Sequence, residues 1–150
     1  MTFTARAAGF LIALALTPVA LATEYLVEAE LWLDGEPAGT PVLMVNAGEP
    51  ASIERGTGDD QSGWRMTIEV EPADADPLAP SGSLWLQVEL QRQAEGVWEA
   101  IADSMLGVPE GEVATLSVVD GDAEPQPETA AAYLRLKTSK VIQMSGSGEP

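Results

Sequence analysis

Hydrophobic and polar residues alternate along most of the chain after residue 23, with the period of two that is typical of half-buried β-strands. Clear alternation runs through 24–33, 64–71 and 83–92, and turn-forming Gly, Pro and Asp separate these stretches. The apolar face of the first stretch consists of Tyr25, Val27, Ala29, Leu31 and Leu33. The pattern therefore predicts an all-β chain, with no helix needed beyond the N-terminal segment.

The chain divides into two similar halves, 24–71 and 83–143, which are joined by a proline-rich seam at 72–82. Each half contains a strand, a turn, a strand, a Gly-Glu turn, a short strand, an acidic loop and a last strand. The predicted strands are 24–33, 40–46, 51–55 and 64–71 in the first half, and 83–92, 97–106, 113–119 and 131–139 in the second. This organisation predicts an eight-stranded antiparallel β-sandwich, or a flattened barrel, built from two four-stranded halves within a single domain at 23–143. A flexible tail is expected at 144–150.

A repeated turn marks the joint within each half. The motif Gly-Glu-x-Ala-[Ser/Thr]-[Ile/Leu] starts at Gly48 and again at Gly111. In each copy we expect the glycine to turn the chain, and the small and branched residues to begin a new strand. If the halves are equivalent, Ile53 and Leu116 occupy equivalent positions.

The stretch 97–106 has an ambiguous inward face, because Trp98 and Ile101 fall on opposite parities. A β-bulge would reconcile the two positions, since it inserts one extra residue into a strand. The sequence therefore predicts a bulge in this strand.

The N-terminal segment 1–22 has the layout of a secretory signal peptide, with Arg6, an apolar run at 7–16 and the small-x-small site Ala20-Leu21-Ala22. An uncleaved N-terminal anchor is the alternative. No later stretch approaches the roughly 20 apolar residues of a spanning helix. We therefore expect a bacterial periplasmic or secreted protein, without a stable membrane span after cleavage.

The charge balance limits the possible partners. The chain has 7 basic and 24 acidic residues, a net charge of −17. Cleavage after residue 22 removes Arg6 and no acid, and this leaves −18. Nucleic acid and anionic membrane surfaces are therefore poor partners, whereas a cationic partner, a metal cation or simple solubility would fit. Because the chain has no cysteine, core packing alone must hold the exported domain together.

The sequence offers little for catalysis. It contains no histidine and no cysteine, which removes the commonest general base, thiolate chemistry and zinc clusters. Carboxylate pairs are too numerous for one pair to be singled out. Ser139 and Lys140 are adjacent, but neighbours on a strand point to opposite faces, so they do not form a dyad. We expect a protein that is not an enzyme and needs no cofactor.

Calcium is the metal that the acidic loops could bind. Asp120, Asp122 and Glu124 place three carboxylates at alternating positions, and calcium prefers such oxygen ligands. Pro125 and Pro127 break the match to an EF-hand loop. The alternative is that these acids are ordinary turn residues.

Two tryptophans are the candidate interaction surface. Trp32 and Trp85 each lie on the polar parity of the first strand of a half, and exposed aromatic residues often mark recognition surfaces. We expect them at equivalent outer positions if the halves are equivalent. Alternatively, a cross-strand partner or a covering loop buries the rings.

Basic residues concentrate near the last strand, where Arg135, Lys137 and Lys140 follow one another closely. Tyr133, Arg135 and Lys137 share one face by parity. These side chains would protect an exposed sheet edge or pair with acidic residues opposite them.

A pattern of an apolar strand, a turn, a short strand and a glycine covers much of 41–72. It consists of Pro41-Val42-Leu43-Met44-Val45, Gly48, Ala51, Ile53, Gly56 and, after the next strand, Pro72. This pattern resembles the β modules of periplasmic secretin-type envelope proteins and is similar to small exported all-β proteins of Gram-negative bacteria. The chain is too short for a pore-forming secretin, so the resemblance implies an envelope location and no functional residue.

Together these features predict a noncatalytic exported β domain that binds a protein or assists an envelope assembly. A calcium- or carbohydrate-binding module that uses the acidic loops and the outer tryptophans is the alternative.

Overall fold

The computed structural model describes residues 23–56, 63–74, 76–122 and 124–142. The expected signal peptide at 1–22 and tail at 144–150 lie outside this range. The described residues contain no helix, and their strands are β1 (Glu24–Leu33), β2 (Glu36–Gly39), β3 (Val42–Asn46), β4 (Ala51–Gly56), β5 (Gly63–Pro72), β6 (Ser83–Ala94), β7 (Val97–Pro109), β8 (Val113–Val118) and β9 (Ala132–Lys140).

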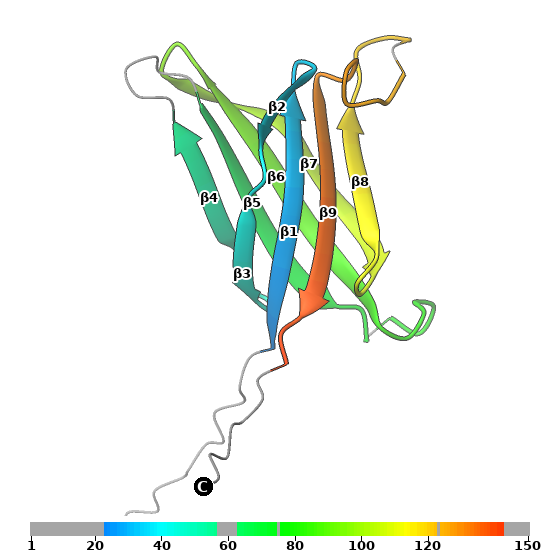
Figure 1. Ribbon diagram of the computed structural model, residues 1–150. Coiled ribbons are helices and arrows are strands. Elements are labelled where there is room, and N and C mark those ends of the chain that lie inside the picture. Colours follow the sequence, from blue (N-terminus) through cyan, green and yellow to red (C-terminus); the bar gives the residue numbers. More distant parts are fainter. Residues whose placement is uncertain (1–22, 57–62, 75, 123, 143–150) are drawn as a thin grey trace, which may run out of the picture.

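The strands form two antiparallel sheets that face each other (Figure 1). Sheet A has the order β2-β1-β9-β8, and β3 also pairs with β1; sheet B has the order β4-β5-β6-β7. No hydrogen-bonded ladder joins the two sheets within the described strands, so the fold is the expected sandwich and not a flattened barrel.

The core lies between the sheets and follows the predicted alternation. In β5 and β6 every second residue is buried, and the same holds for β1 and β9. Completely buried side chains come from both halves of the sequence, among them Val27, Leu31, Met66, Ile68, Leu86, Leu90, Leu134 and Leu136. The seam at 72–82 connects β5 to β6, which are neighbours in sheet B. The halves therefore share one core.

The described residues form nine strands, one more than the eight expected. Glu36–Gly39, which we expected in a turn, forms β2, and the turn itself contains only Asp34 and Gly35, both with positive φ. This two-residue loop suits the twist of a tight hairpin. β2 and β3 pair with the same strand, β1, and are separated only by Thr40 and Pro41. Proline has no N–H to donate to a ladder, which explains a break at this position.

The predicted bulge in the second half is confirmed. Leu90 pairs with Ala102, whereas the next residue of β6, Gln91, pairs with Ala100. Ile101 is therefore the extra residue of β7. The first half has a matching irregularity, because the β1–β2 register also shifts by one residue at Leu31.

The two halves have the same connectivity and the same register. β1, the β2/β3 edge, β4 and β5 correspond in order to β6, β7, β8 and β9, with the first hairpin of each half in one sheet and its second hairpin in the other. The matching cross-strand pairs are Val27–Leu43 with Leu86–Leu106, Leu31–Gly39 with Leu90–Ala102, Val27–Thr138 with Leu86–Val70, and Ile53–Met66 with Leu116–Leu134. Ile53 and Leu116 are thus in equivalent positions, as expected.

The Gly-Glu turns also match in detail. Gly48 and Gly111 have φ values of 78° and 81°, which favour glycine. The Gly48 N–H donates to the carbonyl of Val70 at 2.9 Å, and the Gly111 N–H donates to the carbonyl of Thr138 at 2.8 Å. Each turn therefore ties the start of a hairpin, β4–β5 or β8–β9, to the end of the second strand of that same hairpin, within one sheet.

Candidate functional site

Trp32 lies near the end of β1 on the outer face of sheet A and is half-buried. Its ring meets that of Tyr133, the register partner on β9, edge to face at a centroid distance of 5.6 Å. Pro37 of β2 is the partner on the other side. Such a pair stabilises the sheet, so Trp32 has the cross-strand contact of a structural residue.

Trp85 lies near the start of β6 on the outer face of sheet B and is also half-buried. Its register partners are Glu71 on β5 and Gly107 on β7. A Cβ placed on Gly107 would come within 3.0 Å of Cζ3 of Trp85, so the six-membered ring packs directly against the glycine backbone. The indole can approach β7 this closely only because position 107 has no side chain.

The structure does not bring Trp32 and Trp85 together. They lie on different sheets, whose outer faces point in opposite directions, and at opposite ends of equivalent strands. In the register that the two halves share, the position equivalent to Trp85 is Leu26, and the position equivalent to Trp32 is Gln91. The expectation that the two indoles occupy equivalent positions was therefore wrong.

A third tryptophan shares the outer face of sheet B with Trp85. Trp98 pairs with Gln93 of β6, because the bulge at Ile101 shifts the parity of the first residues of β7. The guanidinium carbon of Arg65 lies 4.2 Å from the centre of the Trp98 ring, which is a cation–π contact. The sequence pattern could have assigned Trp98 to this face once the position of the bulge was known.

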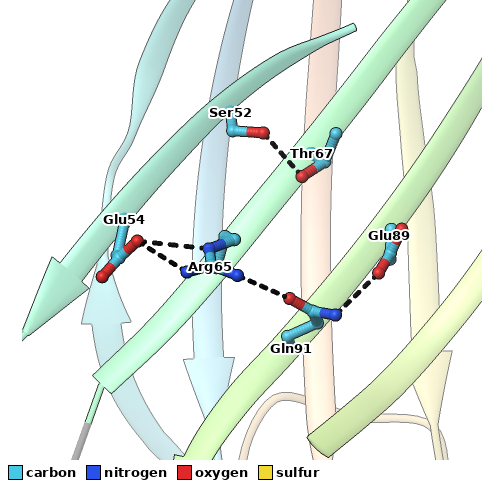
Figure 2. A network of polar contacts seen from close by, with 6 residues as sticks. All are labelled: Ser52, Glu54, Arg65, Thr67, Glu89 and Gln91. Carbon is cyan, nitrogen blue, oxygen red and sulfur yellow. Dashed lines mark hydrogen bonds and ion pairs between the residues drawn. The ribbon is translucent and has the colours of Figure 1, made fainter. Parts of the chain in front are cut away.

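Arg65 is the centre of a polar network on this face (Figure 2). Its Nε and Nη2 atoms donate to Oε2 of Glu54 at 3.2 and 3.0 Å, and Nη1 donates to Oε1 of Gln91 at 3.2 Å. Gln91 in turn donates to Glu89 at 2.8 Å. The positive charge of Arg65 is thus already paired with the Glu54 carboxylate within the protein.

The rest of the outer face of sheet B is acidic. Glu69, Glu71, Glu89 and Asp103 share this face with Glu54, and Arg65 is the only basic residue on it among the described strands. Glu89 and Asp103 are direct register partners, although like charges in this arrangement repel. The Gln87 amide donates to Asp103 and offsets part of this cost. We call this surface, with Trp85 and Trp98, the acidic face.

The outer face of sheet A has a different charge pattern. Arg135 forms an ion pair with Glu30 at 3.5 Å, and Lys137 is the register partner of Glu28. The strand β9 that carries both basic residues lies in the middle of sheet A, between β1 and β8. Arg135 therefore pairs with an acid and Lys137 lies beside one, whereas Lys140 has Tyr25 as its register partner. The alternative that these residues protect a sheet edge was wrong, because β9 is not an edge strand.

The candidate calcium ligands lie in the exposed loop between β8 and β9. Asp120, Asp122 and Glu124 are all exposed, and residue 123 lies outside the described residues. A carboxylate oxygen of Glu124 accepts a hydrogen bond from the Gln126 side chain at 2.9 Å. The described part of the chain contains no group of three His, Cys, Asp or Glu side chains arranged to hold a metal ion. The three carboxylates are therefore not gathered around a common point.

No protein-family model, curated protein or solved structure matches this chain. Within the described ranges, no helix has the length and apolar character needed to cross a membrane. Function therefore has to be inferred from the surfaces themselves, and of the two outer sheet faces the acidic face departs further from a balance of charges.

Proposed function

We propose that the chain is a noncatalytic binding domain, periplasmic or secreted in a bacterium, that recognises a cationic protein partner or a cationic part of an envelope assembly. The acidic face of sheet B is its binding surface. The observation that supports this most directly is the charge of that face, where five carboxylates share the surface with one guanidinium that is already held by Glu54.

Electrostatics gives such a face a specific use. A surface of one sign attracts partners of the opposite sign and raises their association rate, while it rejects partners of the same sign. The strands β5, β6 and β7 hold the carboxylates at fixed spacings, so a partner that binds them does not have to order a flexible loop. After cleavage of the signal peptide the net charge would be −18, and this charge also attracts cationic partners at long range.

The test compares the two outer faces. The purified protein is immobilised and incubated with envelope extract at about 50 mM and about 500 mM salt, concentrations that differ about threefold in screening length. The double variant Glu89→Gln, Asp103→Asn neutralises part of the acidic face. The matched double variant Glu28→Gln, Glu30→Gln removes the same charge from sheet A.

We expect wild type and the sheet A variant to retain one stoichiometric basic protein at low salt, and the sheet B variant to lose it. Retention of the same protein by the sheet B variant, or capture of an acidic protein that survives high salt, would contradict the proposal.

A carbohydrate-binding module is the second candidate, because Trp85 and Trp98 share one face with the side chains of Gln87, Glu89 and Gln91 between them. Indoles and planar polar groups can stack on and hydrogen-bond to sugar rings. Quenching or a shift of tryptophan fluorescence by soluble glycans, lost in Trp85→Ala, would favour this function over protein binding. The calcium version of the alternative has no comparable gathering of ligands among the described residues.

A further inference from the structure

The acidic face contains an internal example of how it binds a guanidinium. Arg65 donates two hydrogen bonds to one carboxylate oxygen of Glu54, while its guanidinium lies 4.2 Å from the centre of the Trp98 ring. A carboxylate and an indole, contributed by two different strands, thus hold one arginine side chain. Arginine suits this arrangement better than lysine, since its planar guanidinium both stacks and donates two hydrogen bonds.

The same two groups occur at the other end of the face without a cation from the described residues. Glu71 on β5 and Trp85 on β6 are direct register partners, so both side chains rise from the same face of the sheet. Glu71 is exposed, and its carboxylate has no hydrogen bond or ion pair to another described residue. The nearest acids on the face, beginning with Glu69, add to the negative charge.

A hollow of about 330 Å³ lies beside Trp85. Leu78, Pro80 and Val108 give it a largely apolar lining, and the Asp76 carboxylate, which accepts a hydrogen bond from the Leu78 N–H at 2.9 Å, lies at the same hollow. Leu78 is 92% exposed, so its side chain is open to contact from outside the domain. An apolar hollow next to a carboxylate and an indole fits the aliphatic stem of an arginine side chain.

Comparison of the two halves shows that the framework does not require this group. The positions equivalent to Trp85, Glu71 and Gly107 are Leu26, Ser139 and Met44, which are also cross-strand partners of one another on sheet A. The register is the same, but the side chains there are neutral and provide no aromatic ring. The pair of Trp85 and Glu71, with the glycine that admits the indole, is therefore a local departure from a shared framework.

We propose that Trp85 and Glu71 form a subsite for an arginine side chain of the cationic partner. The guanidinium stacks on the indole and pairs with the Glu71 carboxylate, as Arg65 does with Trp98 and Glu54, and its aliphatic stem lies in the adjoining hollow. This inference rests on the proposed function, because it specifies the side chain that the acidic face reads.

The test uses two synthetic peptides of equal length and charge, an arginine-serine repeat and a lysine-serine repeat, titrated into the full chain by calorimetry at low salt. Wild type is expected to bind the arginine peptide about five- to tenfold more tightly than the lysine peptide. Glu71→Gln and Trp85→Ala should each abolish that preference. The matched controls Glu28→Gln and Trp32→Ala, both on sheet A, should keep it.

Each outcome discriminates. If wild type binds both peptides equally, or if the arginine preference survives in Glu71→Gln, the subsite is refuted while the acidic face stands. If wild type binds neither peptide, the proposed function fails as well. Since Glu71 is exposed and makes no hydrogen bond or ion pair to another described residue, its variant keeps the test valid even where Trp85→Ala lowers stability.

Discussion

Replacing Thr138 with valine is expected to stabilise the fold. Thr138 is 1% exposed, and its Oγ1 has no hydrogen-bond partner among the described residues. Its register partner on β1, Val27, is completely buried. In the other half the equivalent position is Val70, which is also completely buried. The same place in the same framework thus holds a hydroxyl in one half and a methyl group in the other.

The size of the effect follows from the buried hydroxyl. A buried polar group without a partner costs about 1–3 kcal/mol, whereas its apolar counterpart of the same shape does not. Valine fills nearly the volume of threonine and leaves no cavity, so we expect Thr138→Val to raise the free energy of unfolding by about 1–2 kcal/mol. For a domain of this size the melting temperature changes by about 4 °C per kcal/mol, which predicts an increase of about 4–8 °C.

The assay is thermal unfolding followed by circular dichroism, together with urea unfolding at 25 °C. The reciprocal variant Val70→Thr introduces a hydroxyl at the equivalent place and should lower stability by about 1–3 kcal/mol. Thr138→Ser keeps the hydroxyl and removes the methyl group, so it should also be less stable than wild type. The slope of the urea transition should be unchanged in all three variants, because the surface exposed on unfolding is the same.

The reasoning would be refuted if Thr138→Val lowered the melting temperature while Val70→Thr also lowered it. The hydroxyl of Thr138 would then be satisfied in solution, and the two halves would differ in their internal hydrogen bonding at this position.

Three further predictions concern the turns, the indole and pH. Gly111→Ala should cost about 1 kcal/mol, because φ is 81° there and no atom lies near the new Cβ, so an unchanged urea midpoint would contradict the positive φ. Gly107→Ala should displace the Trp85 ring, whose Cζ3 lies 3.0 Å from the position that the new Cβ would take. The displacement should shift the tryptophan fluorescence emission. The shift should be absent when Gly107→Ala is made in a Trp85→Phe background. Burial, with smaller contributions from the charges of Glu110 and Asp74, raises the pKa of Tyr25. The folded state then keeps its proton after the unfolded chain loses it, so stability should fall as pH rises above about 10. Tyr25→Phe should reduce that loss, and equal slopes for the two proteins in urea unfolding between about pH 8 and 11 would argue against it.

The sequence pattern was sufficient for every described strand except β2, and for the inner and outer faces of the regularly alternating strands. A period of two decides which side chains enter the core, and the buried residues of β1, β5, β6 and β9 follow it. The ambiguity of Trp98 and Ile101 correctly predicted a bulge, because one extra residue is the only way to keep both flanking segments in register. These features are local, so a local pattern can predict them.

The order of the strands within each sheet is not a local property, and predictions that depended on it were less successful. Whether Arg135 and Lys137 lie at an edge or in the middle of a sheet depends on β8, which pairs with the side of β9 that faces away from β1. The equivalence of Trp32 and Trp85 depended on the register between the halves. In the structure Val27 corresponds to Leu86, so Leu26, and not Trp32, is the counterpart of Trp85.

The correspondence between the halves provides a control within one molecule. Both halves bury their apolar faces in the same register and turn at Gly48 and Gly111 with the same hydrogen bond. Differences on the outer faces therefore do not arise from the demands of the fold. On sheet A, Glu28 and Glu30 have basic register partners, Lys137 and Arg135. On sheet B, Glu54 pairs with Arg65, but the other acids have an amide, another acid or an indole as register partner. Repulsion between Glu89 and Asp103 destabilises the free domain, and a cationic partner would relieve it, so binding and the charge pattern of the acidic face have one physical explanation.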